Sequence, residues 1–235
     1  MMRLKNIFPD FGIALIAIAV MSAMLAFASP DKASAENKAG EPLILAEVSD
    51  TEARAGSSFD LVAATTERSL GNPNAPITVI EYASMTCAHC AAFHNEVFND
   101  LKAAYIDTGH VYWIFREYPL DRLALRASQV ARCVQPSMYF NFVEVLFSSQ
   151  DRWSRSDDPM KSLANTARLA GIDQETFQAC VSNQDLELHV LQTMRTGQSQ
   201  WKVSSTPTFI INYGEETLSG VRSLEDFQRA FEKLQ

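Results

Sequence analysis

The chain has 235 residues and a formal net charge of −8 at pH 7, with 28 acidic against 20 basic side chains. Such an acidic balance makes a nucleic acid an unexpected partner, because binding to phosphates needs a basic surface. The roughly 200 residues that would follow an N-terminal leader suit one domain with a sizeable core.

The first 35 residues are predicted to be a secretory signal peptide. Arg3 and Lys5 precede an apolar run from Phe11 to Ala28, and Ala33-Ser34-Ala35 fits a small-residue cleavage site. Cleavage after Ala28 is a second option, and an uncleaved membrane anchor is the alternative interpretation. Cleavage after Ala35 would leave 17 basic and 26 acidic residues, a net charge of −9.

Residues 36–58 are expected to form a flexible leader, because they are rich in small and charged residues without a period. The apolar segment Leu43–Leu45 lies within it and could alternatively serve oligomerisation. An exported chain with four cysteines belongs in an oxidising compartment, and we expect the periplasm. Once two cysteines are assigned to a Cys-x-x-Cys motif, Cys133 and Cys180 remain, and the even count suggests a second disulfide.

The ordered domain is predicted to begin near residue 59. Phe59–Val62 is interpreted as a short edge strand, and Ile77–Ala83, rich in β-branched and aromatic residues, as a strong strand. From Cys87 onward the spacing changes to that of a helix, with an apolar stripe formed by Cys90, Phe93, Val97 and Leu101.

Cys87-Ala88-His89-Cys90 therefore lies where a strand turns into a helix. Cys87 stands at the helix start, where free N–H groups and the helix dipole favour a thiolate, the reactive form of cysteine. His89 adds a proton donor or positive charge beside the sulfur. Cys90 lies one turn later on the buried stripe, at a separation that a disulfide tolerates. The pair can therefore cycle between dithiol and disulfide.

Val111–Phe115 is a second strong strand, so the chain begins with a β-α-β unit, which implies parallel strands and a right-handed crossover. A helical section then occupies about residues 121–197. Its predicted helices are Leu123–Val134, Ser137–Ser148, one after Asp158-Pro159, one from Asp173 that carries Cys180, and Leu186–Thr196.

The last segment returns to strands. Thr208–Asn212 and Glu216–Leu218 are predicted to form a hairpin, and Ser223 to cap a final helix. The order of elements therefore predicts the α/β class, with a helical section that interrupts an α/β unit.

From about residue 70 to the end, the chain resembles the DsbA-like thiol:disulfide oxidoreductases. The resemblance rests on Glu81–Ser84 before the Cys-x-x-Cys motif, on Phe115–Leu120, and on Ser205-Thr206-Pro207-Thr208-Phe209. It implies a thioredoxin-like fold interrupted by an all-helical insertion, in which residues 59–235 form one DsbA-like thioredoxin domain without a cofactor. It also implies that Pro207 is cis and packs beside the Cys-x-x-Cys motif, with the backbone of Thr206 facing an extended substrate.

The resemblance assigns Glu81 to the family's buried acid behind the active site, from which it can exchange protons with Cys90. The alternative for Glu81 is a charge at the strand edge facing solvent. As a family function, the resemblance implies oxidation of unfolded exported proteins that carry free cysteines, with a quinone-coupled membrane oxidase as the recycling partner.

Two departures leave the direction of electron flow open. Thr206 precedes the proline where the best-known oxidases carry Val, and the Cys133–Cys180 pair matches only a subset of the family. A disulfide isomerase or reductase of the same fold is therefore the alternative function.

A zinc-binding protein and a chaperone module are the less favoured alternatives from other functional classes. A zinc site could use Cys87, Cys90 and His94, with His89 or His110 as a fourth ligand, but no second pair stands at finger spacing and His94 is expected on the helix surface. A chaperone module would not need an intact Cys-x-x-Cys motif.

Overall fold

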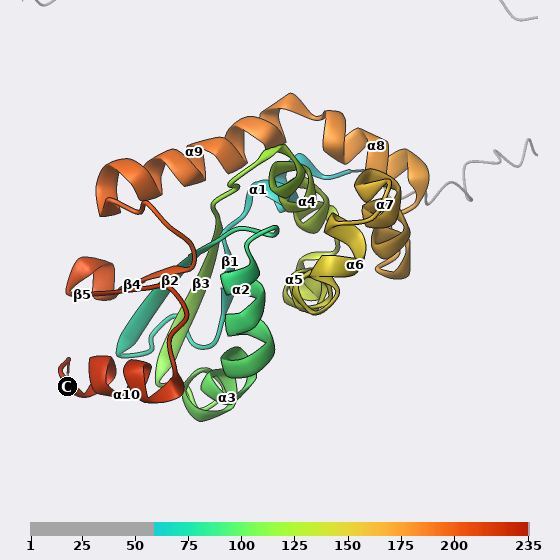
Figure 1. Cartoon of the computed structure of the whole chain (residues 1–235). Coiled ribbons are helices and arrows are strands. Elements are labelled where there is room, and N and C mark those ends of the chain that lie inside the picture. The colour runs from blue at the N-terminus through green and yellow to red at the C-terminus, as the bar shows by residue number, and fades with distance from the viewer. Residues whose placement is uncertain (1–58, 235) are drawn as a thin grey trace, which may run out of the picture. The chain divides into compact units, whose positions relative to one another are not determined.

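The computed structural model describes residues 59–234 and contains a five-stranded mixed sheet (Figure 1). The predicted signal peptide (residues 1–35) and the predicted leader (residues 36–58) both lie outside the described residues. The strand order is β1-β3-β2-β4-β5. The strands are β1 (Arg68–Leu70), β2 (Ile77–Ala83), β3 (Val111–Glu117), β4 (Thr208–Ile211) and β5 (Glu216–Ser219).

The two central strands, β2 and β3, are parallel, and every other pairing is antiparallel. The connection between them is one continuous helical segment in which α-helical and π-helical turns alternate. It comprises α2 (Ala88–Phe93), η1 (His94–Phe98), α3 (Asn99–Leu101) and η2 (Lys102–Ile106). This confirms the predicted β-α-β unit with its crossover helix.

Six α-helices stand between β3 and β4, which confirms a thioredoxin-like fold interrupted by helices. They are α4 (Arg122–Cys133), α5 (Tyr139–Ser148), α6 (Gln150–Ser154), α7 (Pro159–Leu169), α8 (Gln174–Ser182) and α9 (Gln184–Trp201). The short α6 was not predicted. After the β4–β5 hairpin, Ser223 caps α10 (Leu224–Glu232) with a capping box completed by Asp226.

The prediction of an edge strand at Phe59–Val62 is wrong. The carboxylate of Asp60 accepts hydrogen bonds from the backbone N–H groups of Val62 and Ala63 at 2.9 and 3.1 Å, and so begins the helix α1 (Leu61–Thr65). An aspartate at this position favours a helix start over a strand. The edge strand of the sheet is β1, which pairs with β3.

Alternation along β2 divides the core between the two faces of the sheet. Ile77 and Val79 share one apolar cluster with Phe93 of α2 and Phe227 of α10. Ile80 and Tyr82 point to the other face, where α9 covers the sheet (Figure 1). Gly197 allows this close packing, because a Cβ there would lie 2.7 Å from the Tyr82 ring.

This alternation also places Glu81. Because it is two residues from Val79, Glu81 shares the face that the helical segment α2–η2 covers, and its side chain is fully buried. The alternative of a solvent-facing charge at the strand edge is therefore excluded. Within residues 59–234, no helix has the length and apolar character needed to span a bilayer.

Candidate active site

The two cysteines of the motif differ in exposure because they occupy different positions on one helix. Cys87 is the N-cap of α2, with φ −79° and ψ 118°, and is partly exposed. Cys90 lies one turn later on the face that packs into the core, and it is fully buried. Both are free thiols in this structure. An incoming sulfur can therefore reach Cys87 but not Cys90.

The surroundings of Cys87 stabilise a thiolate. A hydrogen bond with the Cys90 thiol, helped by the Thr206 side chain and the backbone N–H groups of Cys90 and His89, lowers the pKa of Cys87 to about 5, although partial burial opposes this. Donors directed at the charged form favour ionisation. Cys87 is thus ionised at neutral pH and is both a nucleophile and a good leaving group.

Cys90 behaves in the opposite way. Burial raises the pKa of the Cys90 thiol well above its usual range, and the neighbouring Cys87 and the Glu81 carboxylate raise it further. Cys90 therefore stays protonated when the pair is reduced. The two thiols share one negative charge, and it resides on the accessible sulfur.

His89 contributes to the site through its backbone, and the expected role of its side chain as a proton donor or positive charge stays a prediction. Its side chain is exposed, and its backbone N–H contributes to the lowered pKa of Cys87. The contribution of His89 thus comes from the helix start, which any residue there would supply.

Thr206 and Pro207 lie beside the motif. The peptide bond between them is cis, and the Cys87 sulfur lies 3.4 Å from the Thr206 carbonyl oxygen, to which it can donate only while it is a protonated thiol. Both residues are buried, and they directly precede β4, which pairs with β2. The structure therefore brings two segments about 120 residues apart in sequence to the same sulfur.

Two polar side chains of the helical insertion hold the active-site loop, and the sequence analysis missed both. The Gln150 amide donates to the carbonyl oxygens of Met85 and Cys87 at 2.9 and 3.0 Å. Asp121 accepts from the Thr86 hydroxyl at 2.7 Å and caps α4 through Ala124. The capping position of Asp121 was readable from the sequence, but the contact of Gln150, across 63 residues, was not.

Behind the motif, Glu81 is paired with a histidine. Its Oε1 lies 2.9 Å from Nε2 of His94, and Nδ1 of His94 lies 2.8 Å from Oε1 of Glu144 on α5. His94 is fully buried, so the expectation of a surface histidine is wrong. Burial disfavours the imidazolium, but the two carboxylates outweigh this and raise the pKa of His94 to about 9.

These contacts also bear on the zinc alternative. Both ring nitrogens of His94 face carboxylates, so neither is available as a third ligand beside Cys87 and Cys90. Within the described part of the chain, no group of three or more His, Cys, Asp or Glu residues is arranged so that it could hold a metal ion.

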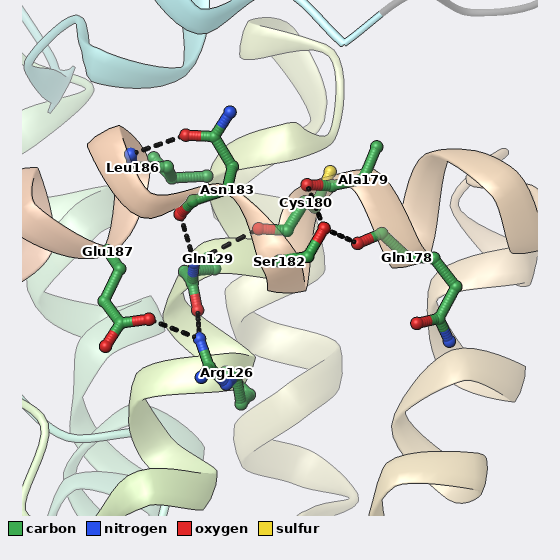
Figure 2. A network of polar contacts seen from close by, with 9 residues as sticks. All are labelled: Arg126, Gln129, Gln178, Ala179, Cys180, Ser182, Asn183, Leu186 and Glu187. Carbon is green, nitrogen blue, oxygen red and sulfur yellow. Dashed lines mark hydrogen bonds and ion pairs between the residues drawn. The ribbon is translucent and has the colours of Figure 1, made fainter.

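Cys133 and Cys180 form a disulfide that joins α4 to α8, with their Cα atoms 6.3 Å apart. A polar network lies directly beside it (Figure 2). The Gln129 amide donates to the carbonyl oxygens of Cys180 and Asn183, both at 3.1 Å. Asn183 caps α9, and Arg126 bridges Gln129 to Glu187. The disulfide thus lies at the junction of three helices, remote in sequence from the Cys-x-x-Cys motif.

Comparisons with known proteins agree with this fold and site. Residues 63–233 match the family described as thioredoxin. The crystal structure of alpha-DsbA1 from Wolbachia pipientis superposes with a TM-score of 0.67 at 32% identity, covering 72% of this chain and 90% of that one.

Two curated relatives have corresponding names. A putative protein-disulfide oxidoreductase from Rickettsia bellii is 32% identical over 61% of this chain, and disulfide bond formation protein D from Bacillus subtilis is 25% identical over 70%. The match spans 56% of the Rickettsia protein and 75% of the Bacillus protein. The chain belongs to the thioredoxin family and is DsbA-like in sequence, fold and Cys-x-x-Cys geometry.

Proposed function

We propose that this chain is a periplasmic oxidase that introduces disulfides into exported proteins through Cys87 and Cys90. The observation that carries the proposal is the asymmetry of the pair. The accessible Cys87 has a pKa lowered to about 5, whereas the buried Cys90 has a raised pKa. A stable thiolate in the reduced form makes the disulfide form easy to reduce, and such a protein oxidises other thiols.

The reaction begins with the oxidised enzyme, in which Cys87 and Cys90 form a disulfide. A substrate thiolate attacks the sulfur of Cys87, and the bond to Cys90 breaks. A second substrate thiolate then attacks the substrate sulfur of this mixed disulfide and expels Cys87 as a thiolate. The substrate leaves oxidised and the enzyme is left reduced, so two electrons have moved to the cysteine pair.

The loop around Thr206 would place the substrate. The Thr206 carbonyl oxygen lies beside the Cys87 sulfur, at the position where an extended chain could run past the motif. Thr206 and Pro207 are therefore proposed as substrate-positioning residues, and unfolded exported proteins with free cysteines as substrates. A membrane oxidase coupled to quinone is proposed as the recycling partner, and the signal-like N-terminus supports export.

The reduction potential of the pair tests the direction of the reaction. After equilibration with mixtures of reduced and oxidised glutathione, we expect a potential above about −180 mV, in the range of protein oxidases. The fraction oxidised is measured by alkylation and mass spectrometry, with Cys133 and Cys180 as an internal reference. A reduction potential of about −270 mV, that of thioredoxin, would overturn the oxidase proposal.

Thr206 favours an isomerase or reductase as the second candidate. The sequence resembles a family whose isomerase and reductase branches also carry threonine before this proline. In this chain the Thr206 hydroxyl is buried at the site. If this candidate is correct, the protein will rearrange a scrambled disulfide substrate faster than it oxidises a reduced one.

A further inference from the structure

Three titratable side chains connect the buried interior behind the motif to the protein surface. The side chains of Glu81 and His94 are fully buried, whereas that of Glu144 is 29% exposed. Hydrogen bonds of 2.9 and 2.8 Å join them in the order Glu81, His94, Glu144. They come from β2, η1 and α5, so the fold assembles this row from separate elements.

Aromatic rings surround the imidazole. The Phe147 ring stacks on it at 4.4 Å between centroids, Phe98 lies at 4.7 Å, and Phe93 and Phe115 meet it edge-on at 5.4 and 6.0 Å. The charged groups that face the imidazole are Glu81 from β2 and Glu144 from α5, and the thiol of Cys90 precedes it on α2. The two ring nitrogens, one facing Glu81 and the other Glu144, are therefore the polar contacts of an imidazole that is otherwise surrounded by aromatic rings.

The inner end of the row lies at Cys90. His94 follows Cys90 by four residues, so both project from the same side of the helix. The Glu81 carboxylate contributes to the raised pKa of Cys90. Glu81 uses Oε1 for His94, while its Oε2 is buried and has no hydrogen-bond partner within residues 59–234. That oxygen is the acceptor left for a proton from the thiol.

We propose that Glu81, His94 and Glu144 carry the proton of Cys90 between the active site and the solvent at α5. The inference rests on the proposed thiol:disulfide exchange and deepens it. The expected proton exchange between Glu81 and Cys90 is only its first step. His94 and Glu144 complete it as positioning residues that act through Glu81.

The proton moves when Cys90 changes its bonding. During reoxidation, Cys87 is held in a mixed disulfide with the oxidant. Cys90 then attacks the Cys87 sulfur, the Cys87–Cys90 bond forms, and the oxidant's sulfur leaves as a thiolate. The Cys90 proton passes to Glu81, and the His94 imidazolium releases its Nδ1 proton to Glu144. The imidazole that remains is neutral and keeps its Nε2 proton facing Glu81, which retains the proton from Cys90. Glu144 releases one proton to water.

When a substrate is oxidised, the same row works in reverse. Attack on Cys87 leaves Cys90 as a buried thiolate, which is costly without a proton. Glu81 gives its proton to Cys90, and a proton that enters at Glu144 returns to Nδ1 of His94. The imidazolium is thereby restored, and it is the form of the reduced protein at neutral pH, since the pKa of His94 is raised to about 9.

The test follows the two steps of reoxidation separately by rapid acid quench and mass spectrometry. Reduced protein is mixed with excess oxidised glutathione between pH 6 and 8. Formation of the Cys87–glutathione mixed disulfide needs no proton from Cys90, whereas its resolution by Cys90 does. Glu144→Gln should leave the first step unchanged and slow the second about tenfold, less than the loss of a direct general acid or base, because Glu144 acts through His94 and Glu81.

Glu187→Gln is the matched control, because Glu187 is also a partly exposed carboxylate of the helical insertion, 34% exposed and paired with Arg126. It should slow neither step. Formate provides a second readout, since a small carboxylate can replace the missing proton carrier. In Glu144→Ala the rate of resolution should rise with formate concentration, and in Glu187→Ala it should not.

The outcomes separate the two proposals. If the Cys87 mixed disulfide does not form in the unaltered protein, the proposed function is overturned and the relay with it. If it forms but Glu144→Gln resolves it at the unaltered rate, only the relay is overturned. A slowed resolution that formate does not restore, or that Glu187→Gln reproduces, would show a structural role and would also overturn the relay.

Discussion

At the scale of single residues, the reactivity of the pair follows from where one helix begins. Cys87 stands at the N-cap and Cys90 one turn inside, so the first meets free N–H groups and solvent while the second meets the core. The sequence was sufficient to predict this difference. It was not sufficient to predict that Thr206 lies beside Cys87, because that contact depends on how β4 pairs with β2.

The first prediction concerns the roles of the two cysteines. Cys90→Ser should accumulate mixed disulfides between Cys87 and reduced substrate proteins, because the thiol that resolves them is gone. Cys87→Ser should accumulate none, because Cys90 is fully buried. Non-reducing electrophoresis after mixing with a reduced substrate measures both variants. Trapping by Cys87→Ser alone would contradict this assignment.

His94 shows where a residue-level interpretation failed. It follows Cys90 by four residues, so the helical period already places it on the inner face, whereas the sequence analysis expects it on the helix surface. Its two partners, Glu81 and Glu144, satisfy both ring nitrogens inside the core. A buried polar group is acceptable when it is fully hydrogen-bonded, and neither partner is close to it in sequence.

At the scale of elements, the strands β2 and β3 and most helices were predictable because their periods and caps are local. The helical stripe through Val97 was predicted less well. The π-helical turn η1 shifts the register, so Phe98 becomes buried while Val97 is only partly buried. The one-turn helix α6 was missed because it lacks a full amphipathic period, although it carries Gln150, which holds the active-site loop.

The second prediction concerns the disulfide between α4 and α8. With a sequence separation of 47, it closes a long loop, and the chain-entropy estimate for such a loop is a stabilisation of about 4 kcal/mol, an upper value. Replacing both Cys133 and Cys180 by Ala should lower the melting temperature by several degrees while retaining insulin-reduction activity. Thermal unfolding followed by circular dichroism and an insulin turbidity assay measure the two effects.

Cys87→Ala is the matched control for that experiment, because it removes activity without opening the loop. If the double variant remains folded but loses as much insulin-reduction activity as Cys87→Ala does, Cys133 and Cys180 have a redox role and the structural assignment is wrong. An unchanged melting temperature would also contradict the prediction.

At the scale of the whole molecule, the active site lies where the sheet unit and the helical insertion meet. The sheet supplies Glu81 and the Thr206 loop, α2 supplies the cysteines, and the insertion supplies Gln150, Asp121 and Glu144. The fold class could be predicted from the order of elements. The contacts between the two parts could not, because each joins residues that are distant in sequence and depends on side-chain packing.

The third prediction concerns the stability of the two redox states. Reduction removes a disulfide across four residues, which costs the folded protein about 2 kcal/mol through unfolded-state entropy. Reduction also creates the Cys87 thiolate, whose pKa falls to about 5 in the folded protein, against about 8.5 in an unfolded chain. A lowered pKa stabilises the folded reduced protein fully above the unfolded value, and this stabilisation is lost as the pH falls toward 5.

The difference between the loop contribution and the thiolate contribution decides which redox state melts at the higher temperature at each pH. At pH 8, the lowered pKa of Cys87 counts for about three pKa units and stabilises the folded reduced protein by at most about 4 kcal/mol. Because Cys87 is half-buried, solvent screening reduces this to about 3 kcal/mol. This exceeds the loop contribution, so the reduced protein should melt above the oxidised protein at pH 8. Near pH 5 the thiolate contribution is almost gone, and the order should reverse. Melting curves of both forms from pH 4.5 to 8.5 measure the crossing, with Cys90→Ala as a control that cannot form the bond. An oxidised form that is the more stable at every pH would contradict both the lowered pKa and the oxidase proposal.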